Sequence, residues 1–442
     1  MARGPGGRAD GAKITAPDAS PCLRNRKIYV NPVGLRNRRI CVNNIVLQHY
    51  WRTKQTLDRD RLSCKTACGT WMHHPLVGCH EIRGGRKKVG EMTSDQQRDK
   101  EISARNTLTD LPGLIGVIEV PVMSLPVIST RVYVLEGTRG HILIDAGWDD
   151  DTAWQALSDG LATLGREIRE TEGIVLTHHH PDHSGLAGRV KAESDAWIAM
   201  HEIDADLMDQ LRSQESAEAH LSWELNNLAA AGAPTLALES YRQGGGSFSM
   251  AYMSAEVDRK LGDGDVITPA AGGLTALWLP GHTGGHMGAI LERQRAVFTG
   301  DHVLSKTSPH VGEFVFPVDE HDLLNRYLES LEKLRTLAGD GFSIYPAHEV
   351  VDIDWPRRIE ELAVHHRRRL DDVRQVLSDG EPRTLWDIAV AMTWAVKWAD
   401  IPPISWPLAL SECSAHLTYL VNHGNAKSLG ASDQPMKFVA KG

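Results

Sequence analysis

The chain has 442 residues, 41% of them hydrophobic and 24% charged, and a formal net charge of −9 at pH 7. This length and composition are typical of a soluble globular protein with two or three domains. No apolar run approaches the roughly 20 residues of a membrane-spanning helix, and no signal-peptide pattern opens the chain, so we expect a cytoplasmic protein with no membrane part.

The first hundred residues differ from the rest in charge. Residues 1–100 hold 20 Lys and Arg against 8 Asp and Glu, a net +12, which leaves −21 for residues 101–442. Basic residues, Gly, Pro and Asn interrupt every apolar cluster in this part, so we predict that residues 1–105 form a disordered basic extension. Five of the six cysteines lie there and only Cys413 lies elsewhere. The rest of the chain is therefore not expected to depend on disulfides.

From about residue 111 onward, strand and helix patterns alternate. Apolar runs predict strands at 115–122, 131–135, 141–144 and 173–176, with an amphipathic helix at 150–164. After His201 the rhythm becomes helical, with helices predicted at 205–211 and 217–231. We interpret residues 203–257 as a helical insertion that acts as a lid. Strands are predicted again at 265–267, 274–279, 289–292 and 296–299, followed by a helix at 320–337.

The last ninety residues are predicted to be mainly helical. Helices are expected at 355–377, 385–398 and 406–421, and the polar tail 425–442 is expected to form a small hairpin. The first of these helices carries five arginines, namely Arg357, Arg358, Arg367, Arg368 and Arg369.

One stretch concentrates metal-binding side chains. Residues 177–185 read Thr-His-His-His-Pro-Asp-His-Ser-Gly and directly follow the apolar run 173–176. His178 and His180 lie two apart, so on an extended segment they point the same way, and Asp182 and His183 follow on a turn. Neutral imidazoles and a carboxylate are the ligands that Zn²⁺ takes. This clustering predicts a metal site.

Four further motifs close apolar runs beside Gly or Pro. Asp145 follows residues 141–144, His282 lies in Pro280-Gly281-His282, Asp301 follows Thr299-Gly300, and His348 follows Tyr345-Pro346-Ala347. With residues 177–185, these motifs resemble the five motifs of the metallo-β-lactamase superfamily, in the family order and over roughly residues 110–350.

The resemblance implies an α/β fold, an αββα sandwich of two mixed sheets with helices outside. It places the catalytic domain at 106–350, with the insertion at about 203–257. The helical order of residues 351–442 resembles the winged-helix-like C-terminal domain of one branch of the superfamily, which includes an endoribonuclease and polyketide-pathway thioesterases.

The resemblance also implies seven metal ligands and two metal ions, expected to be Zn with Fe or Mn as alternatives. One metal is assigned to His178, His180 and His282, the other to Asp182, His183 and His348, with Asp301 bridging them. A metal-bound hydroxide is then the expected nucleophile. Asp182 and Asp145 are the predicted catalytic residues, Asp182 as a proton acceptor and Asp145 by orienting ligands.

Two substrate classes stay open. The first is a small thioester, ester or lactone. A bridging Asp301 is compatible with this class, and the net charge of −21 on residues 101–442 favours it over RNA. The alternative is single-stranded RNA, cleaved by a zinc-dependent endoribonuclease whose five arginines contact phosphates. We favour the small-molecule hydrolase, because no basic stripe with interleaved aromatics extends beyond that one helix. The sequence gives no signal for an oligomeric state.

Overall fold

The computed structural model describes residues 111–122, 129–212, 217–243, 256–312, 322–430 and 435–441. The predicted disordered extension, residues 1–105, lies outside this range, as do the Gly-rich part of the insertion and part of the C-terminal tail.

A six-stranded sheet is formed by the first half of the described chain, in the order β1-β2-β3-β4-β5-β6. Its first two pairings are antiparallel and the remaining three are parallel. The strand bounds are β1 Leu114–Pro121, β2 Ser129–Glu136, β3 His141–Ile144, β4 Thr171–Val175, β5 Trp197–His201 and β6 Arg259–Leu261.

A second sheet has five strands in the order β11-β10-β9-β8-β7, and only β10 and β11 pair in parallel. The bounds are β7 Val266–Thr268, β8 Leu274–Trp278, β9 Met287–Leu291, β10 Ala296–Gly300 and β11 Ser343–Pro346. The eight predicted strands are all present, and none of their ends differs from the prediction by more than two residues, whereas β5, β6 and β11 were not predicted as strands.

The two sheets pack face to face through one buried cluster, as side chains alternate along each strand. Tyr133 and Leu135 of β2 belong to the cluster between the sheets, whereas Val132 and Val134 belong to the cluster on the outer face. Phe298 of β10 reaches Tyr133 across the interface, with ring centroids 4.9 Å apart. Because both faces of these strands are buried, their sequences read as continuous apolar runs.

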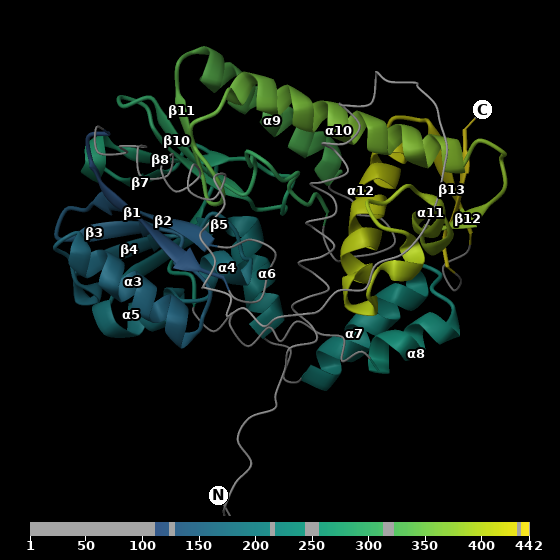
Figure 1. Cartoon of the computed structure of the whole chain (residues 1–442), viewed down its shortest axis with the longest axis horizontal. Helices are drawn as coiled ribbons and strands as arrows, with labels where there is room; N and C mark the ends of the chain where they lie inside the picture. The colour runs from purple at the N-terminus through teal and green to yellow at the C-terminus, as the bar shows by residue number, and fades with distance from the viewer. Residues whose placement is uncertain are drawn as a thin grey trace, which may run out of the picture. The chain divides into compact units, whose positions relative to one another are not determined.

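Helices cover the outer faces of both sheets, which gives the predicted mixed α/β layering (Figure 1). On the first sheet lie α3 Asp151–Thr163, α5 Ala187–Ser194 and α6 Glu202–Arg212. On the second sheet, Val297 and Ile344 pack in the same cluster as α9 Leu323–Gly339 and α10 Trp355–Val376.

The C-terminal region is helical and ends in a small sheet. It consists of α10, α11 Leu385–Ala391 and α12 Trp406–Asn422, with a three-stranded antiparallel sheet ordered β12-β14-β13. The bounds of these strands are β12 Arg383–Thr384, β13 Ala426–Leu429 and β14 Lys437–Ala440, and the pairing of the last two agrees with the predicted hairpin. The predicted helix at 385–398 is shorter than expected, because Met392 leaves the helix with extended backbone.

The helical insertion divides between two neighbours. Its first helix, α6, covers the first sheet, whereas α7 Ala217–Ala230 and α8 Thr235–Gln243 pack on the C-terminal helices. The backbone N–H of Trp386 donates to the carbonyl of Ala231, and Tyr241 is buried in the same cluster as Trp386. A lid over the catalytic cleft stays a prediction for this segment.

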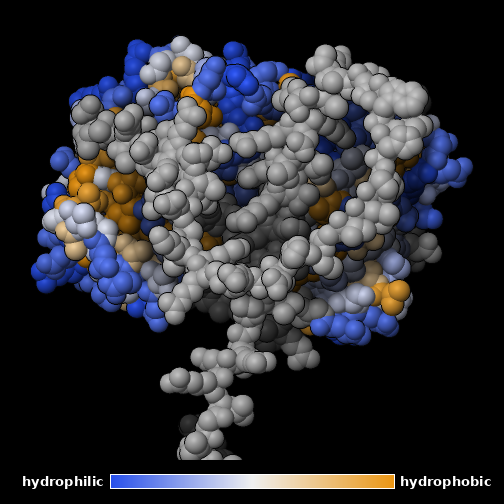
Figure 2. Space-filling model, viewed as in Figure 1, coloured by the Kyte–Doolittle hydropathy of each residue, from blue (hydrophilic) through white to orange (hydrophobic). Residues whose placement is uncertain are grey.

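The described surface in Figure 2 is mainly hydrophilic, with separate hydrophobic areas. The large hydrophobic side chains that are exposed among the described residues come from five different elements and are Ile203, Leu236, Val266, Val390 and Leu429. No helix in the described part of the chain is both long and apolar enough to cross a membrane.

Candidate metal centre

Each predicted site residue follows the end of a strand. Asp145 follows β3 and takes a φ of 61°, and the histidine cluster follows β4. Pro181 is the first residue of the short helix α4 Pro181–Ser184, so the chain turns and brings His183 back beside His178. His282, Asp301 and His348 follow β8, β10 and β11 of the other sheet. The site therefore lies where the ends of the two sheets meet.

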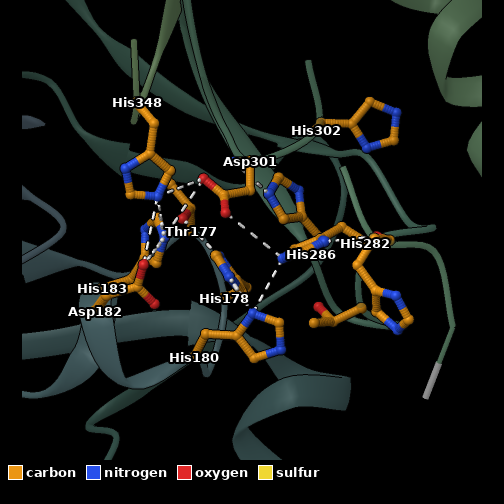
Figure 3. Close-up of polar contacts among 12 residues, drawn as sticks. Thr177, His178, His180, Asp182, His183, His282, His286, Asp301, His302 and His348 are labelled. Carbon is orange, nitrogen blue, oxygen red and sulfur yellow. Dashed lines mark hydrogen bonds and ion pairs between the residues drawn. The ribbon is translucent and has the colours of Figure 1, made fainter. Parts of the chain in front are cut away.

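All seven predicted ligands come together (Figure 3). In each of three groups, one ligand atom per residue lies within 4.8 Å of the others. His178, His180 and His282 form one group, which we call the imidazole pocket. The second group, which we call the carboxylate pocket, consists of Asp182, His183 and His348. The third group joins Asp301 to His178 and His183, one histidine from each pocket.

Four of the histidines are held at Nδ1 by a partner outside the cluster. Their Nδ1 atoms lie 2.7–3.1 Å from an oxygen outside the cluster. These pairs are His178 with Thr177 Oγ1, His183 with Asp145 Oδ2, His282 with the carbonyl of His310, and His348 with the carbonyl of Ser129. Carbonyls and ionised carboxylates only accept, so Nδ1 of His183, His282 and His348 must donate, and Nε2 can then present a lone pair to the centre.

Asp301 divides its two oxygens between the pockets. Its Oδ1 lies 3.1 Å from Nε2 of His348 and 3.4 Å from Nε2 of His183, and its Oδ2 lies 3.7 Å from Nε2 of His282. The buried Oδ1 has no aligned hydrogen-bond donor within the described part of the chain. A buried carboxylate oxygen surrounded by imidazole nitrogens is an environment that a divalent cation satisfies. The donor set therefore fits a metal ion in each pocket.

The electrostatics of the pockets are opposite. In the imidazole pocket, burial and then the neighbouring imidazoles hold the pKa of His178 and His180 well below the ordinary value. In the carboxylate pocket, burial would lower the pKa of His348, but Asp301 and Asp182 raise it to about 10. Burial likewise opposes the shift at His183, where Asp145, Asp301 and Asp182 raise the pKa well above its usual range. The surroundings thus favour the neutral form of the histidines in the imidazole pocket and the protonated form of those in the carboxylate pocket.

Asp145, predicted to orient ligands, lies beside the histidine cluster. Its carboxylate accepts from the backbone N–H of Thr177 at 2.8 Å, from the Thr177 hydroxyl and from Nδ1 of His183. It touches both ends of the histidine cluster without belonging to any candidate metal group. Gly300 comes close to the same hydroxyl, since a Cβ there would lie 2.7 Å from Thr177 Oγ1 and the φ is +50°. The turn before Asp301 therefore requires glycine.

Sequence reasoning missed Asp204, a buried carboxylate on α6. It accepts from both N–H groups of His179, from the Thr283 hydroxyl at 2.8 Å and from the backbone N–H of Gly285 at 2.7 Å. These donors belong to two different loops, one carrying His178 and His180 and the other carrying His282. Asp204 therefore ties together the loops of the imidazole pocket, and its position on a helix 20 residues beyond the motif gave no signal.

Glu349, the residue after His348, has a structural task as well. Its carboxylate accepts from the Ser305 hydroxyl and from the backbone N–H and hydroxyl of Thr307, with a φ of 66° at the residue itself. These bonds tie the segment after Asp301 to the segment after His348. The neighbouring histidines behave differently from the ligands: His302 points away from the cluster (Figure 3), and Nε2 of His286 accepts from the backbone N–H of Asp301 at 3.2 Å.

Comparison with known proteins agrees with this geometry. The sequence model of the metallo-beta-lactamase superfamily matches residues 125–340. The probable metallo-hydrolase YqjP of Bacillus subtilis is 26% identical over 302 residues, which cover 65% of this chain and 86% of that protein. A metallo-beta-lactamase family protein of Thermus thermophilus is similar in structure, with a TM-score of 0.58 and 29% identity over 75% of this chain and 99% of that one.

Two further relatives carry more specific names. An atrochrysone carboxyl ACP thioesterase of Aspergillus fumigatus is 26% identical over 61% of this chain and 48% of that protein. A hydroxyacylglutathione hydrolase of Rhodopseudomonas palustris is 25% identical over 50% of this chain and 66% of that protein. The family match, the relatives and the His/Asp cluster together support an enzyme, a metallo-hydrolase of the metallo-beta-lactamase superfamily.

Proposed function

We propose that this protein is a dinuclear zinc hydrolase acting on a small thioester, ester or lactone. The observation that carries the proposal is the division of Asp301 between two pockets, each completed by three other side chains. Two dications a few ångströms apart repel each other unless an anionic oxygen lies between them, and Asp301 supplies such oxygens. The imidazole-rich donor set favours Zn, with Fe or Mn as the alternatives.

In this proposal, two bound ions supply a water whose pKa is lowered toward 7 and polarise the carbonyl under attack. The chain's own residues prepare that chemistry. One cation would be held by His178, His180 and His282, the other by Asp182, His183 and His348, and Asp301 would offer a carboxylate oxygen to each. Asp182, only 6% exposed and 3.4 Å from Nε2 of His348, is the candidate proton acceptor. Asp145 keeps His183 in the tautomer that can bind.

Thioesters are the first substrates to test, since relatives include a carboxyl ACP thioesterase and a hydroxyacylglutathione hydrolase. The C-terminal region supports the same branch of the superfamily. Its order of α10, α11, α12 and the β13–β14 hairpin is the one expected of a winged-helix-like domain. We therefore retain the proposed domains, 106–350 as catalytic and 351–442 as winged-helix-like.

The arginine helix does not favour the RNA alternative. Arg369 is buried, donates to the carbonyl of Thr393 and pairs with Glu412. Arg358 turns inward to the carbonyls of Leu304 and Thr307. On the exposed side, Arg357 pairs with Glu361 and Arg367 with Glu360. Four of the five arginines that read as one basic stripe in the sequence thus serve structural ion pairs and packing, which leaves few charges for a phosphate backbone.

The test is a substrate panel with the purified full-length chain. Acyl-glutathione, acyl-pantetheine and acyl-coenzyme A thioesters, an acyl lactone and a short single-stranded RNA are offered before and after removal of metal by a chelator. We expect the lactone or at least one thioester to be hydrolysed, activity to vanish on chelation, and Zn²⁺ to restore it. Cleavage of RNA with no turnover of the acyl substrates would contradict the proposal.

A further inference from the structure

The orientation of one candidate ligand depends on a residue outside the motifs. Nδ1 of His282 donates to the backbone carbonyl of His310 at 2.7 Å, which leaves Nε2 facing His180 at 3.0 Å and Asp301 at 3.7 Å. Because a single bond to Nδ1 fixes both the tautomer and the ring angle, movement of this carbonyl would swing Nε2 away from the imidazole pocket.

His310 is in turn held by the C-terminal region. Its Nε2 lies 3.2 Å from the hydroxyl of Ser411, a fully buried residue of α12. Two residues further on, Gly312 lies against the same residue, since a Cβ there would come within 2.5 Å of Ser411 Oγ and 2.7 Å of its carbonyl oxygen. Val311 between them is fully buried in one cluster with Leu410 of α12. The backbone of residues 310–312 therefore touches α12 directly, without an intervening side chain.

The loop that carries His310 is also held near its start, at Leu304 and Thr307, by a side chain of α10. Arg358 donates from Nε to the carbonyl of Leu304 and from its terminal nitrogen to the carbonyl of Thr307, both at 2.8 Å. Glu349 binds Thr307 from the opposite side. The segment between Asp301 and His310 is thus fixed at both ends by helices that come after the last metal motif in the chain.

We propose that Ser411 and His310 are positioning residues of the metal centre. Ser411 fixes His310, and the carbonyl of His310 orients His282, so the C-terminal helices set the metal affinity of the imidazole pocket. The inference rests on the proposed function in one respect, namely that a cation binds this pocket. It goes beyond it by giving the C-terminal region a part in metal binding, where a domain that only encloses substrate would have none.

Metal binding by the stripped full-length chain tests this directly. Zn²⁺ is titrated against a chromophoric chelator for the wild type, Ser411→Ala, His310→Ala and the double variant, and apo stability is measured by thermal unfolding. Loss of a hydrogen bond that orients a metal-ligating side chain costs roughly 10- to 100-fold in metal affinity. We expect a loss of that size at one of two equivalents in each single variant, and no larger loss in the double variant, because both act through one link.

Thr418→Val is the matched control, on the same helix. Thr418 is buried and its hydroxyl has no hydrogen-bond partner within the described residues, so the variant should bind both equivalents as the wild type does. His180→Ala gives the background from metal bound elsewhere. Should Ser411→Ala fail to fold, the half-buried His310→Ala supplies the result.

Two results would overturn the inference while leaving the proposed function standing: a wild type that binds two equivalents with Ser411→Ala and His310→Ala unchanged, or an equal loss in Thr418→Val. A wild type whose zinc binding matches that of His180→Ala would overturn both the inference and the proposed function.

Discussion

The imidazole pocket and the carboxylate pocket are built from similar residues but differ in charge. The histidines of the first have lowered pKa values, because they are buried beside one another. Those of the second have raised pKa values, since Asp301, Asp182 and Asp145 outweigh their burial. A cation that binds the imidazole pocket is therefore expected to displace no proton, whereas one that binds the carboxylate pocket is expected to displace protons from its histidines. If two cations bind as proposed, their affinities should differ.

Removing the residue that the pockets share should have the largest effect. Asp301→Ala is expected to abolish hydrolysis and to release both metals, because each pocket loses the Asp301 oxygen that faces it while the surrounding loops keep their own bonds. Elemental analysis and circular dichroism of the purified variant check this. Asp301→Asn is the control of equal size. If this variant is also inactive, the loss of hydrolysis is due to the missing negative charge. Full turnover by Asp301→Ala would show that the site assignment is wrong.

Emptying one pocket at a time sharpens the comparison. His180→Ala removes a ligand from the imidazole pocket alone, so hydrolysis should stop and the metal content should fall from two equivalents to one. Asp182→Ala should have the same effect through the carboxylate pocket. Metal analysis of each variant decides the point, and loss of both ions from either one would mean that the pockets cannot fill independently.

Replacing Asp204, which holds the loops of the imidazole pocket, is expected to destabilise the fold. In Asp204→Asn one acceptor oxygen becomes a donor, so at least one buried N–H or O–H group loses its partner, at about 1–3 kcal/mol for each. Urea unfolding of the metal-free protein measures the cost. Asp206→Asn, on the same helix but exposed and paired with Lys260, should change stability by less than about 0.5 kcal/mol. Equal stability of the two variants would contradict the role given to Asp204.

The seven candidate ligands, which the structure brings together, could be picked out from the sequence because each lies beside a strand end, in a short motif whose residue types are unusual. The sheet strands were recognisable for a related reason: their faces are buried, so they read as apolar runs. The edge strand β6, Arg259–Leu261, was missed because it is only three residues long and two of its residues are exposed.

The residues that orient the ligands could not be predicted. Ser129 and His310 act through backbone carbonyls, which any residue offers, and Asp204 reaches the site from a helix. The inward turn of Arg358 and Arg369 depends on tertiary contacts with the Leu304–Thr307 segment and with α12. These are contacts between segments far apart in the chain, and periodicity carries no information about them.

Deletion of residues 1–100 is expected to have little effect. Every hydrogen bond and ion pair that we describe at the two pockets joins residues between Ser129 and Ser411. The value of kcat/KM for the preferred substrate should therefore match that of the full chain. A large loss would show that the basic extension contributes to the fold or to the site.

The smallest expected signal comes from Cys413, the free cysteine of the described part of the chain. Burial raises the pKa of its thiol to about 12, so at pH 8 only about one molecule in 10⁴ carries the thiolate. In a variant lacking residues 1–100, a thiol reagent should label no cysteine at pH 8 until denaturant is added, as mass spectrometry would record. Rapid labelling of the native variant would mean that α12 opens.

Anomalous X-ray scattering at the zinc edge from crystals of the full chain tests the central claim most directly. We predict two peaks, one coordinated by His178, His180 and His282 and one by Asp182, His183 and His348, with an oxygen of Asp301 toward each. A single peak, no peak, or metal bound away from Asp301 would contradict the account.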